Sequence, residues 1–176
     1  MLVFVGSESF FFLALILSYI YYSRKGGELS SSAGYLDILK TAVFSAFLFL
    51  SSLTIYLAEI GLRRGNRKIM LTWLVATIIL GIVFIVGQGI EYSRLFKLNL
   101  TVNRNVFGSA FFTLTGFHGL HVVIGLIVLS IIVTMILSGR FRAIENSAFR
   151  SASVYWHFVD AVWVAVFSVV YIGSLV

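Results

Sequence analysis

The stretch VFGSAFFTLTGFHGLHVVIGLIVLSIIVTMIL, residues 106–137, decides the fold, because it contains no Asp, Glu, Lys or Arg. A bilayer crossing needs about 20 apolar residues, so this stretch crosses with a tilt or protrudes. Four further apolar runs cover about residues 3–22, 41–58, 69–91 and 154–175. All five are too long and too unalternating for barrel strands. The sequence predicts an all-α membrane protein, a single domain over residues 1–176 that forms a bundle of five transmembrane helices.

The composition supports the same class of protein. Hydrophobic residues make up 60% of the 176 residues and charged residues 11%, with a mean hydropathy of +1.02. A soluble domain carries about 45–50% apolar and about 25% charged residues. These values exclude a soluble globular domain and a disordered chain. At roughly 20 residues per span, the apolar residues suffice for about five helices and leave no separate soluble domain.

The scarce residue types limit the chemistry of the chain. It has no cysteine and three histidines, which excludes disulfides, iron–sulfur clusters, thiolate copper sites and cysteine nucleophiles. The net charge is +6, but the basic residues are scattered over the loops and form no stripe for nucleic acid. We therefore expect no nucleic-acid partner, and we interpret the loop charges as a topology signal.

The loop charges predict how the chain sits in the membrane. The first run has no basic leader and no cleavage site, so we expect a retained span. Five crossings place the two ends of the chain on opposite sides. The loops on the N-terminal side hold seven basic residues: Arg63, Arg64, Arg67, Lys68, Arg140, Arg142 and Arg150. The other side holds six: Arg24, Lys25, Lys40, Arg94, Lys97 and Arg104. The positive-inside rule then predicts a cytoplasmic N-terminus.

Polar side chains inside apolar runs are the informative exceptions, because ionisable groups are costly in lipid. Five lie inside the runs: Glu8, His118, His121, His157 and Asp160. Glu59 and Glu91, the latter followed by Tyr92, lie at span ends, where we expect solvation at headgroup level. The aromatic residues Tyr19, Tyr21, Tyr22, Trp156 and Trp163 are expected to serve partly as interface anchors.

The spacing of the histidines argues against a haem. His118 and His121 are three residues apart and share one helix face, so they cannot clamp a haem from both sides. Alignment of Leu137 with Ser153 across the last loop places His157 level with about residue 133, roughly 18–22 Å from the other two. We therefore expect no shared haem or metal site, and no catalytic or cofactor-binding residue.

Structural roles remain for these polar groups. His118 and His121 are expected to form hydrogen bonds between helices. His157 and Asp160 are three residues apart and can pair along one face. Because the first and last helices enter from the same side, Glu8 lies at a similar depth, and a cluster of Glu8, His157 and Asp160 is a further hypothesis.

Two long motifs resemble the cytochrome c oxidase subunit III family. They are FTLTGFHGLHVVIG at residues 112–125 and YWHFVDAVW at residues 155–163. Looser matches are SESFF at residues 7–11 and QGIEY at residues 88–92. Their order and spacing extend the resemblance over nearly the whole chain.

The resemblance implies a helical subunit of a haem–copper oxygen reductase that carries no redox centre. It implies packing against the catalytic subunit I, which with other subunits holds the haem and copper, and a cleft that binds phospholipid. It also implies support of proton uptake and protection of the catalytic site during turnover. Glu8 would be the membrane-embedded carboxylate, and the structural or lipid-contact residues would be His118, His121, Trp156, His157 and Asp160. Seven-helix members have two further helices at the start, which normally form one wall of the lipid cleft.

The sequence thus predicts a non-catalytic subunit III of a cytochrome c oxidase in a prokaryotic inner membrane, within the aerobic respiratory chain. Subunit III of a quinol oxidase and an accessory protein of a nitric oxide reductase remain open alternatives. More remote ones are a b-type cytochrome anchor and a small proton-coupled transporter, although the repeats typical of transporters are not visible.

Overall fold

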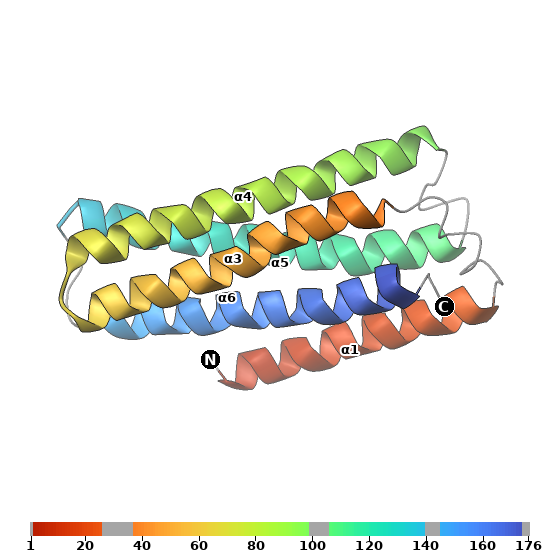
Figure 1. The fold of residues 1–176 in the computed structure, drawn as a ribbon. Helices are drawn as coiled ribbons and strands as arrows, with labels where there is room; N and C mark the ends of the chain where they lie inside the picture. Colours follow the sequence, from red (N-terminus) through yellow and green to blue (C-terminus); the bar gives the residue numbers. More distant parts are fainter. Residues whose placement is uncertain (1, 26–36, 99–105, 140–144, 174–176) are drawn as a thin grey trace.

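A computed structural model describes residues 2–25, 37–98, 106–139 and 145–173 (Figure 1). The helices are α1 (Leu2–Lys25), α3 (Ile38–Arg63), α4 (Arg67–Lys97), α5 (Val106–Leu137) and α6 (Glu145–Phe167), and α6 continues into the π-helical turn η1 (Ser168–Ile172). Five helices are long and apolar enough to cross a membrane. Over the described ranges the chain contains no strand. The predicted all-α membrane class is confirmed.

The helix bounds follow the apolar runs, with one large difference. The helix α6 begins at Glu145, whereas the last apolar run begins only at about residue 154. The residues between include Arg150 and several serines, which lower hydropathy without breaking a helix. An apolar run marks only the most hydrophobic part of a helix, and the hydrogen-bonded helix extends beyond it.

The helices lie side by side along a common direction, with α4 at one edge of the view and α1 at the other (Figure 1). Helix α5 packs against α1, α4 and α6, and α6 packs against α1, α3 and α5. The start of α1 lies part-way along the bundle, short of the α3–α4 turn, and α1 runs from there toward the end at which η1 lies (Figure 1). The helices α5 and α6 are therefore the elements that connect the two edges.

A tight turn joins α3 to α4. Gly65 adopts a φ of 65°, the left-handed conformation that commonly follows a helix end and that glycine adopts without strain. Asn66 then caps α4, because its side chain accepts a hydrogen bond from the Ile69 backbone at 3.1 Å. A Cβ on Gly61 would lie 2.7 Å from the Met70 backbone nitrogen. The backbones of α3 and α4 are therefore in close contact where the two antiparallel helices meet at the turn.

Two tryptophans form the centre of the bundle. Trp156 and Trp163 are fully buried, and their Nε1–H groups donate to Ser51 Oγ and Ser45 Oγ, each at 2.8 Å. An indole N–H removed from water needs such an acceptor. The expectation that these tryptophans anchor the membrane interface is therefore wrong.

Glycines on two helices make room for Trp156. A Cβ on Gly81 of α4 or on Gly125 of α5 would lie 2.9 Å from the indole ring. Small residues allow membrane helices to approach closely, so the ring fits between α4, α5 and α6. Tyr19 is also buried, whereas Tyr21 and Tyr22 are exposed, as interface anchors would be.

Candidate functional site

Glu8 and His121 form a carboxylate–imidazole pair between α1 and α5. Glu8 Oε2 lies 3.0 Å from His121 Nε2. His121 Nδ1 lies 2.7 Å from the Phe117 carbonyl oxygen, which can only accept, so Nδ1 carries a proton. The contact between Nε2 and Oε2 then joins α5 to α1. This pair is a contact between two ionisable side chains, one on α1 and one on α5.

The surroundings of this pair keep it in place. Tyr155 on α6 donates from its hydroxyl to the His121 carbonyl oxygen at 3.0 Å. The ring of Phe12 lies 5.0 Å from the His121 ring, centroid to centroid. The pair is therefore held where α1, α5 and α6 meet, and His121 bonds between helices as predicted.

His157 and Asp160 meet a different partner, Ser52 of α3. Ser52 Oγ donates to Asp160 Oδ2, and His157 Nδ1 lies 3.0 Å from the same Oγ. The two residues share one side of α6, as their spacing predicts, but they are joined through the serine. Glu8 pairs instead with His121, so the hypothesis of a Glu8, His157 and Asp160 cluster is wrong.

The depth alignment of α5 against α6 also needs correction. Tyr155 reaches the carbonyl of His121, and the ring of Trp156 lies against Gly125. His157 is therefore level with residues near His121, and not with residue 133. The error arose because α6 begins at Glu145, so Leu137 is opposite a residue well before Ser153. The histidines differ in side, not in depth.

His118 is enclosed by aromatic rings. It is fully buried, and its ring stacks on Trp163 with centroids 4.7 Å apart. Phe84 lies edge-on at 5.9 Å. Neither ring nitrogen has a hydrogen-bond partner among the described residues, so the predicted interhelical hydrogen bond of His118 is not found there. Its contacts are those of a packed core residue.

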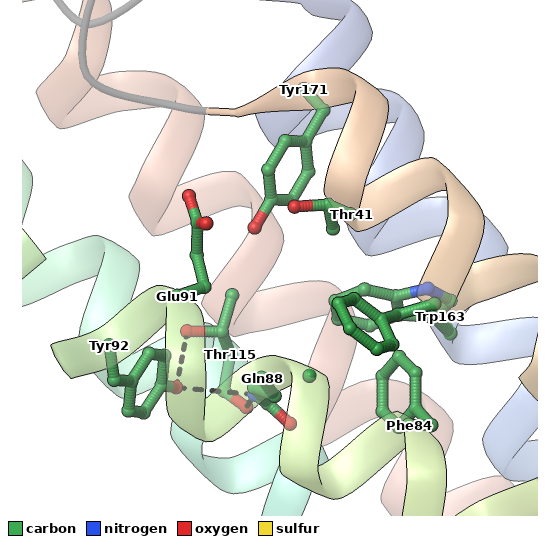
Figure 2. A pocket seen from close by; sticks show the side chains of 10 residues that line it. Thr41, Phe84, Gln88, Glu91, Tyr92, Thr115, Trp163 and Tyr171 are labelled. Carbon is green, nitrogen blue, oxygen red and sulfur yellow. Dashed lines mark hydrogen bonds between the residues drawn. The ribbon is translucent and has the colours of Figure 1, made fainter. Parts of the chain in front are cut away.

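A small cavity of about 10 Å³ lies where α3, α4, α5 and α6 converge near the end of the bundle formed by η1 (Figure 2). This volume is near the minimum that holds one water molecule. Gln88 Nε2 donates to the Tyr92 hydroxyl at 3.2 Å and to the Thr115 carbonyl at 2.8 Å. Tyr92 lies 2.7 Å from Thr115 Oγ1, which in turn donates to the Phe111 carbonyl. These bonds connect α4 to α5.

Glu91 lies on the other side of this cavity, and Figure 2 shows the Tyr171 hydroxyl pointing toward the space beside it. Glu91 is only 7% exposed. Its Oε1 accepts a hydrogen bond from the Asp37 backbone N–H at 3.3 Å. The expectation of headgroup solvation is therefore wrong for Glu91, which satisfies a backbone donor at the start of α3.

Asp37 organises the charges at this end of α3. Its Oδ1 accepts from the Lys40 backbone N–H at 3.3 Å and so caps the helix. Its Oδ2 forms ion pairs with Lys40 Nζ at 2.8 Å and Arg94 Nη1 at 3.2 Å. The Lys40 ammonium and backbone N–H, with help from the Arg94 guanidinium, lower the pKa of Asp37 below 3.8.

We expect a pH-dependent contribution from Asp37 to stability. Because its pKa is lowered in the folded state, the contribution is present above the unfolded pKa near 3.8 and is lost as pH falls through the folded value. Asp37→Asn retains a cap acceptor but removes both ion pairs. The melting temperature of the variant in detergent should therefore fall less steeply than that of the wild type between about pH 5 and pH 3. Identical pH profiles would contradict this role.

Three serines are among the polar residues that sequence reasoning missed. Ser45, Ser51 and Ser52 of α3 bind Trp163, Trp156 and Asp160 respectively. Their only signal was the presence of small hydroxyl residues inside an apolar span, which is ordinary in membrane helices. A second feature, a groove of about 200 Å³ between α1 and α5, was also not predicted; it is lined by Leu15, Ser18, Tyr22, Ser109, Ala110 and Thr113.

Within residues 2–25, 37–98, 106–139 and 145–173, no group of three or more His, Asp or Glu side chains is placed to hold a metal ion. The two histidines of α5 make other contacts: His121 pairs with Glu8, and His118 stacks on Trp163. The polar groups described above connect helices to one another.

The five apolar helices, cross-linked by these interior polar contacts, define an integral membrane protein of the helical-bundle class. A family model of cytochrome c oxidase subunit III matches residues 1–175. The chain belongs to the cytochrome c oxidase subunit III family, and the resemblance seen in its motifs is confirmed.

Individual relatives agree with this assignment. A cytochrome c oxidase subunit 3 of Corynebacterium diphtheriae is 32% identical over 173 residues, 97% of this chain and 84% of the relative. A probable cytochrome c oxidase subunit 3 of Mycobacterium leprae is 33% identical, and the match covers 96% of this chain and 84% of the relative. A cytochrome c oxidase subunit 3 of Synechocystis is 34% identical, and the match covers 96% of this chain and 72% of the relative.

Proposed function

We propose that this chain is the non-catalytic subunit III of a haem–copper cytochrome c oxidase in an aerobic respiratory chain. The observation that carries the proposal is the family match over residues 1–175. The interior polar groups support it, because the contacts Glu8–His121, Ser51–Trp156 and Gln88–Thr115 each connect one helix to another. The chain contributes a packing surface, and the partner subunits carry out oxygen reduction and proton pumping.

The partners follow from the same proposal. Subunit I, with other oxidase subunits, holds the haem and copper, and this chain holds none. The engagement of His121 by Glu8 and of His118 by Trp163 supports this division, because neither imidazole is presented to an axial haem position. The complex lies in a prokaryotic inner membrane, and the N-terminus of this chain is cytoplasmic, as the loop charges favour.

Phospholipid binding has a defined candidate place. The groove between α1 and α5 has a volume of about 200 Å³. It combines apolar walls with serine and threonine hydroxyls. Such a surface suits an acyl chain along its length and a polar ester or headgroup at its end. We place a bound phospholipid there.

Purification from native membranes tests the function. A tag on this chain should co-purify a haem-bearing subunit that reduces oxygen with reduced cytochrome c. The chain purified alone should show no haem absorption band. A stoichiometric haem band in the pure chain would overturn the proposal in favour of a cytochrome anchor. Turnover with quinol, or reduction of nitric oxide, would overturn it in favour of those enzymes.

Glu8→Ala tests whether the embedded carboxylate has a supporting role. Glu8 lies at the α1–α5 contact with His121 as its partner. We expect the initial rate of oxygen reduction to remain within about two-fold of the wild type, because a lost interhelical hydrogen bond costs only about 0.6–2 kcal/mol of packing free energy. Glu8→Gln, which retains an acceptor for His121, is the matched control. An immediate and complete loss of turnover in an intact complex would contradict this role.

A further inference from the structure

An exposed imidazole lies near the middle of the bilayer. His157 is exposed, and it lies well inside the span Ser147–Tyr171. Its partner Ser52 is central in the span Ile38–Arg63. At about 1.5 Å per residue, both lie roughly 15 Å or more from either end of their helices, which is the depth of hydrocarbon. A polar group that faces lipid at this depth is costly, so the site calls for a partner.

The hydrogen bonds of Ser52 determine which kind of hydrogen-bond partner Nε2 of His157 requires. A serine hydroxyl has one proton, and Ser52 donates it to Asp160 Oδ2. His157 Nδ1 must therefore donate to Ser52 Oγ across their 3.0 Å contact. In the neutral ring this leaves Nε2 as an unprotonated acceptor. Among the described residues no hydrogen-bond donor meets Nε2, so the missing partner is a donor.

The exposed side of α6 around His157 has the spacing of a helix-packing seam. Its residues recur at alternating intervals of three and four, and we call them the α6 seam: Val154, His157, Ala161, Val164 and Ser168. This spacing keeps one stripe of a helix in contact with a neighbouring helix. Ala161 and Ser168 are small, which permits a close backbone approach.

The exposed side of α4 provides the contrast. Over residues 79–88, the middle of that helix, its exposed residues are Ile79, Ile82 and Val86, all large and apolar, as lipid-facing residues are. The α6 seam instead combines small side chains with one polar side chain at mid-depth. This composition is typical of contacts between helices in membranes.

We infer that the α6 seam docks a transmembrane helix of a partner oxidase subunit, and that this helix donates a hydrogen bond to His157 Nε2 at the bilayer midplane. The inference rests on the proposed function for the existence of the complex. Lipid acyl chains carry no donor, so they cannot satisfy Nε2. A second copy of this chain is disfavoured, because a two-fold axis through the seam brings two unprotonated acceptors together.

Photo-crosslinking in native membranes tests the contact. p-Benzoylphenylalanine is introduced at Val154 or Val164 of the seam, with Ile82 on α4 as the matched exposed control. We expect an adduct with the haem-bearing subunit from both seam positions and not from Ile82. An adduct with twice the mass of this chain would overturn the inference in favour of a second copy. Lipid adducts alone, or equal yields from the seam and the control, would also overturn it.

Substitution of His157 tests the hydrogen bond itself. His157→Leu should lower the fraction of haem-bearing subunit retained during detergent purification by about three-fold or more. His157→Gln places an amide oxygen near the position of Nε2 and should restore retention. Ile79→Leu is the control for a hydrophobic change on an exposed face. Equal retention in the leucine and glutamine variants, with unchanged melting temperatures, would overturn the inference.

The two proposals can fail separately. If the wild-type chain retains no haem-bearing subunit, the proposed function fails. If it retains that subunit while the seam positions crosslink elsewhere, the function stands and the docking assignment fails.

Discussion

Replacing Trp156 with alanine is expected to lower the free energy of unfolding by about 3–5 kcal/mol, the range for a buried large aromatic residue. The indole ring is fully buried and occupies space that Gly81 and Gly125 leave open. Its removal therefore creates a cavity between three helices and leaves Ser51 without its donor. Stability in membranes depends on such packing, because lipid provides little hydrophobic drive between helices. Reversible unfolding by SDS in mixed micelles measures the change.

Two matched variants separate the contributions at Trp156. Trp73→Ala removes the same side chain from α4 at a position that is 36% exposed, and it should cost much less. Trp156→Phe retains most of the ring but removes the N–H group that donates to Ser51, and it should cost about 0.6–2 kcal/mol. Equal losses in Trp156→Ala and Trp73→Ala would contradict the role of Trp156 in the core.

The second large effect is expected from Gly87→Ala. A Cβ on Gly87 would lie 2.2 Å from Cγ of Phe44 on α3, well inside the contact distance of two carbon atoms. Phe44 must then rotate away or α3 must separate from α4. Overpacking of this kind typically costs about 1–3 kcal/mol and occasionally more. The same SDS unfolding measurement should show this loss.

The control for Gly87→Ala lies two residues further along α4. A Cβ on Gly89 meets no atom within 4 Å, so Gly89→Ala should be neutral or slightly stabilising, because alanine favours helix. Phe44→Ala combined with Gly87→Ala should recover part of the stability, since the clash is with that ring. A double variant no more stable than the additive expectation would show that the clash is not the cause.

The fold class could be predicted from the sequence, because only helices and closed barrels can span a lipid bilayer. Long apolar runs must form helices, since each backbone group needs an internal partner. The residues that carry polar contacts were also identifiable, because Glu8, His121 and Asp160 interrupt apolar runs. Their positions inside the apolar runs are what single them out.

Which of these residues pair with one another could not be predicted from the sequence. A single sequence does not specify which helices are neighbours, so Glu8 was assigned to the wrong partners. The position of α6 along α5 depended on where α6 begins, and hydropathy does not register the polar turns from Glu145. The serines of α3 gave no distinct signal, although Ser52 determines how His157 and Asp160 meet.

The pairing of Glu8 with His121 has a consequence for biosynthesis. The two residues are separated by 113 positions in the chain. At about 5–20 residues per second of synthesis, the carboxyl group of α1 waits roughly 6–23 s before its imidazole has been made. During that interval α1 is in or near the membrane with an unpaired acid. The contact between α1 and α5 at Glu8 can therefore form only after α5 has been synthesised.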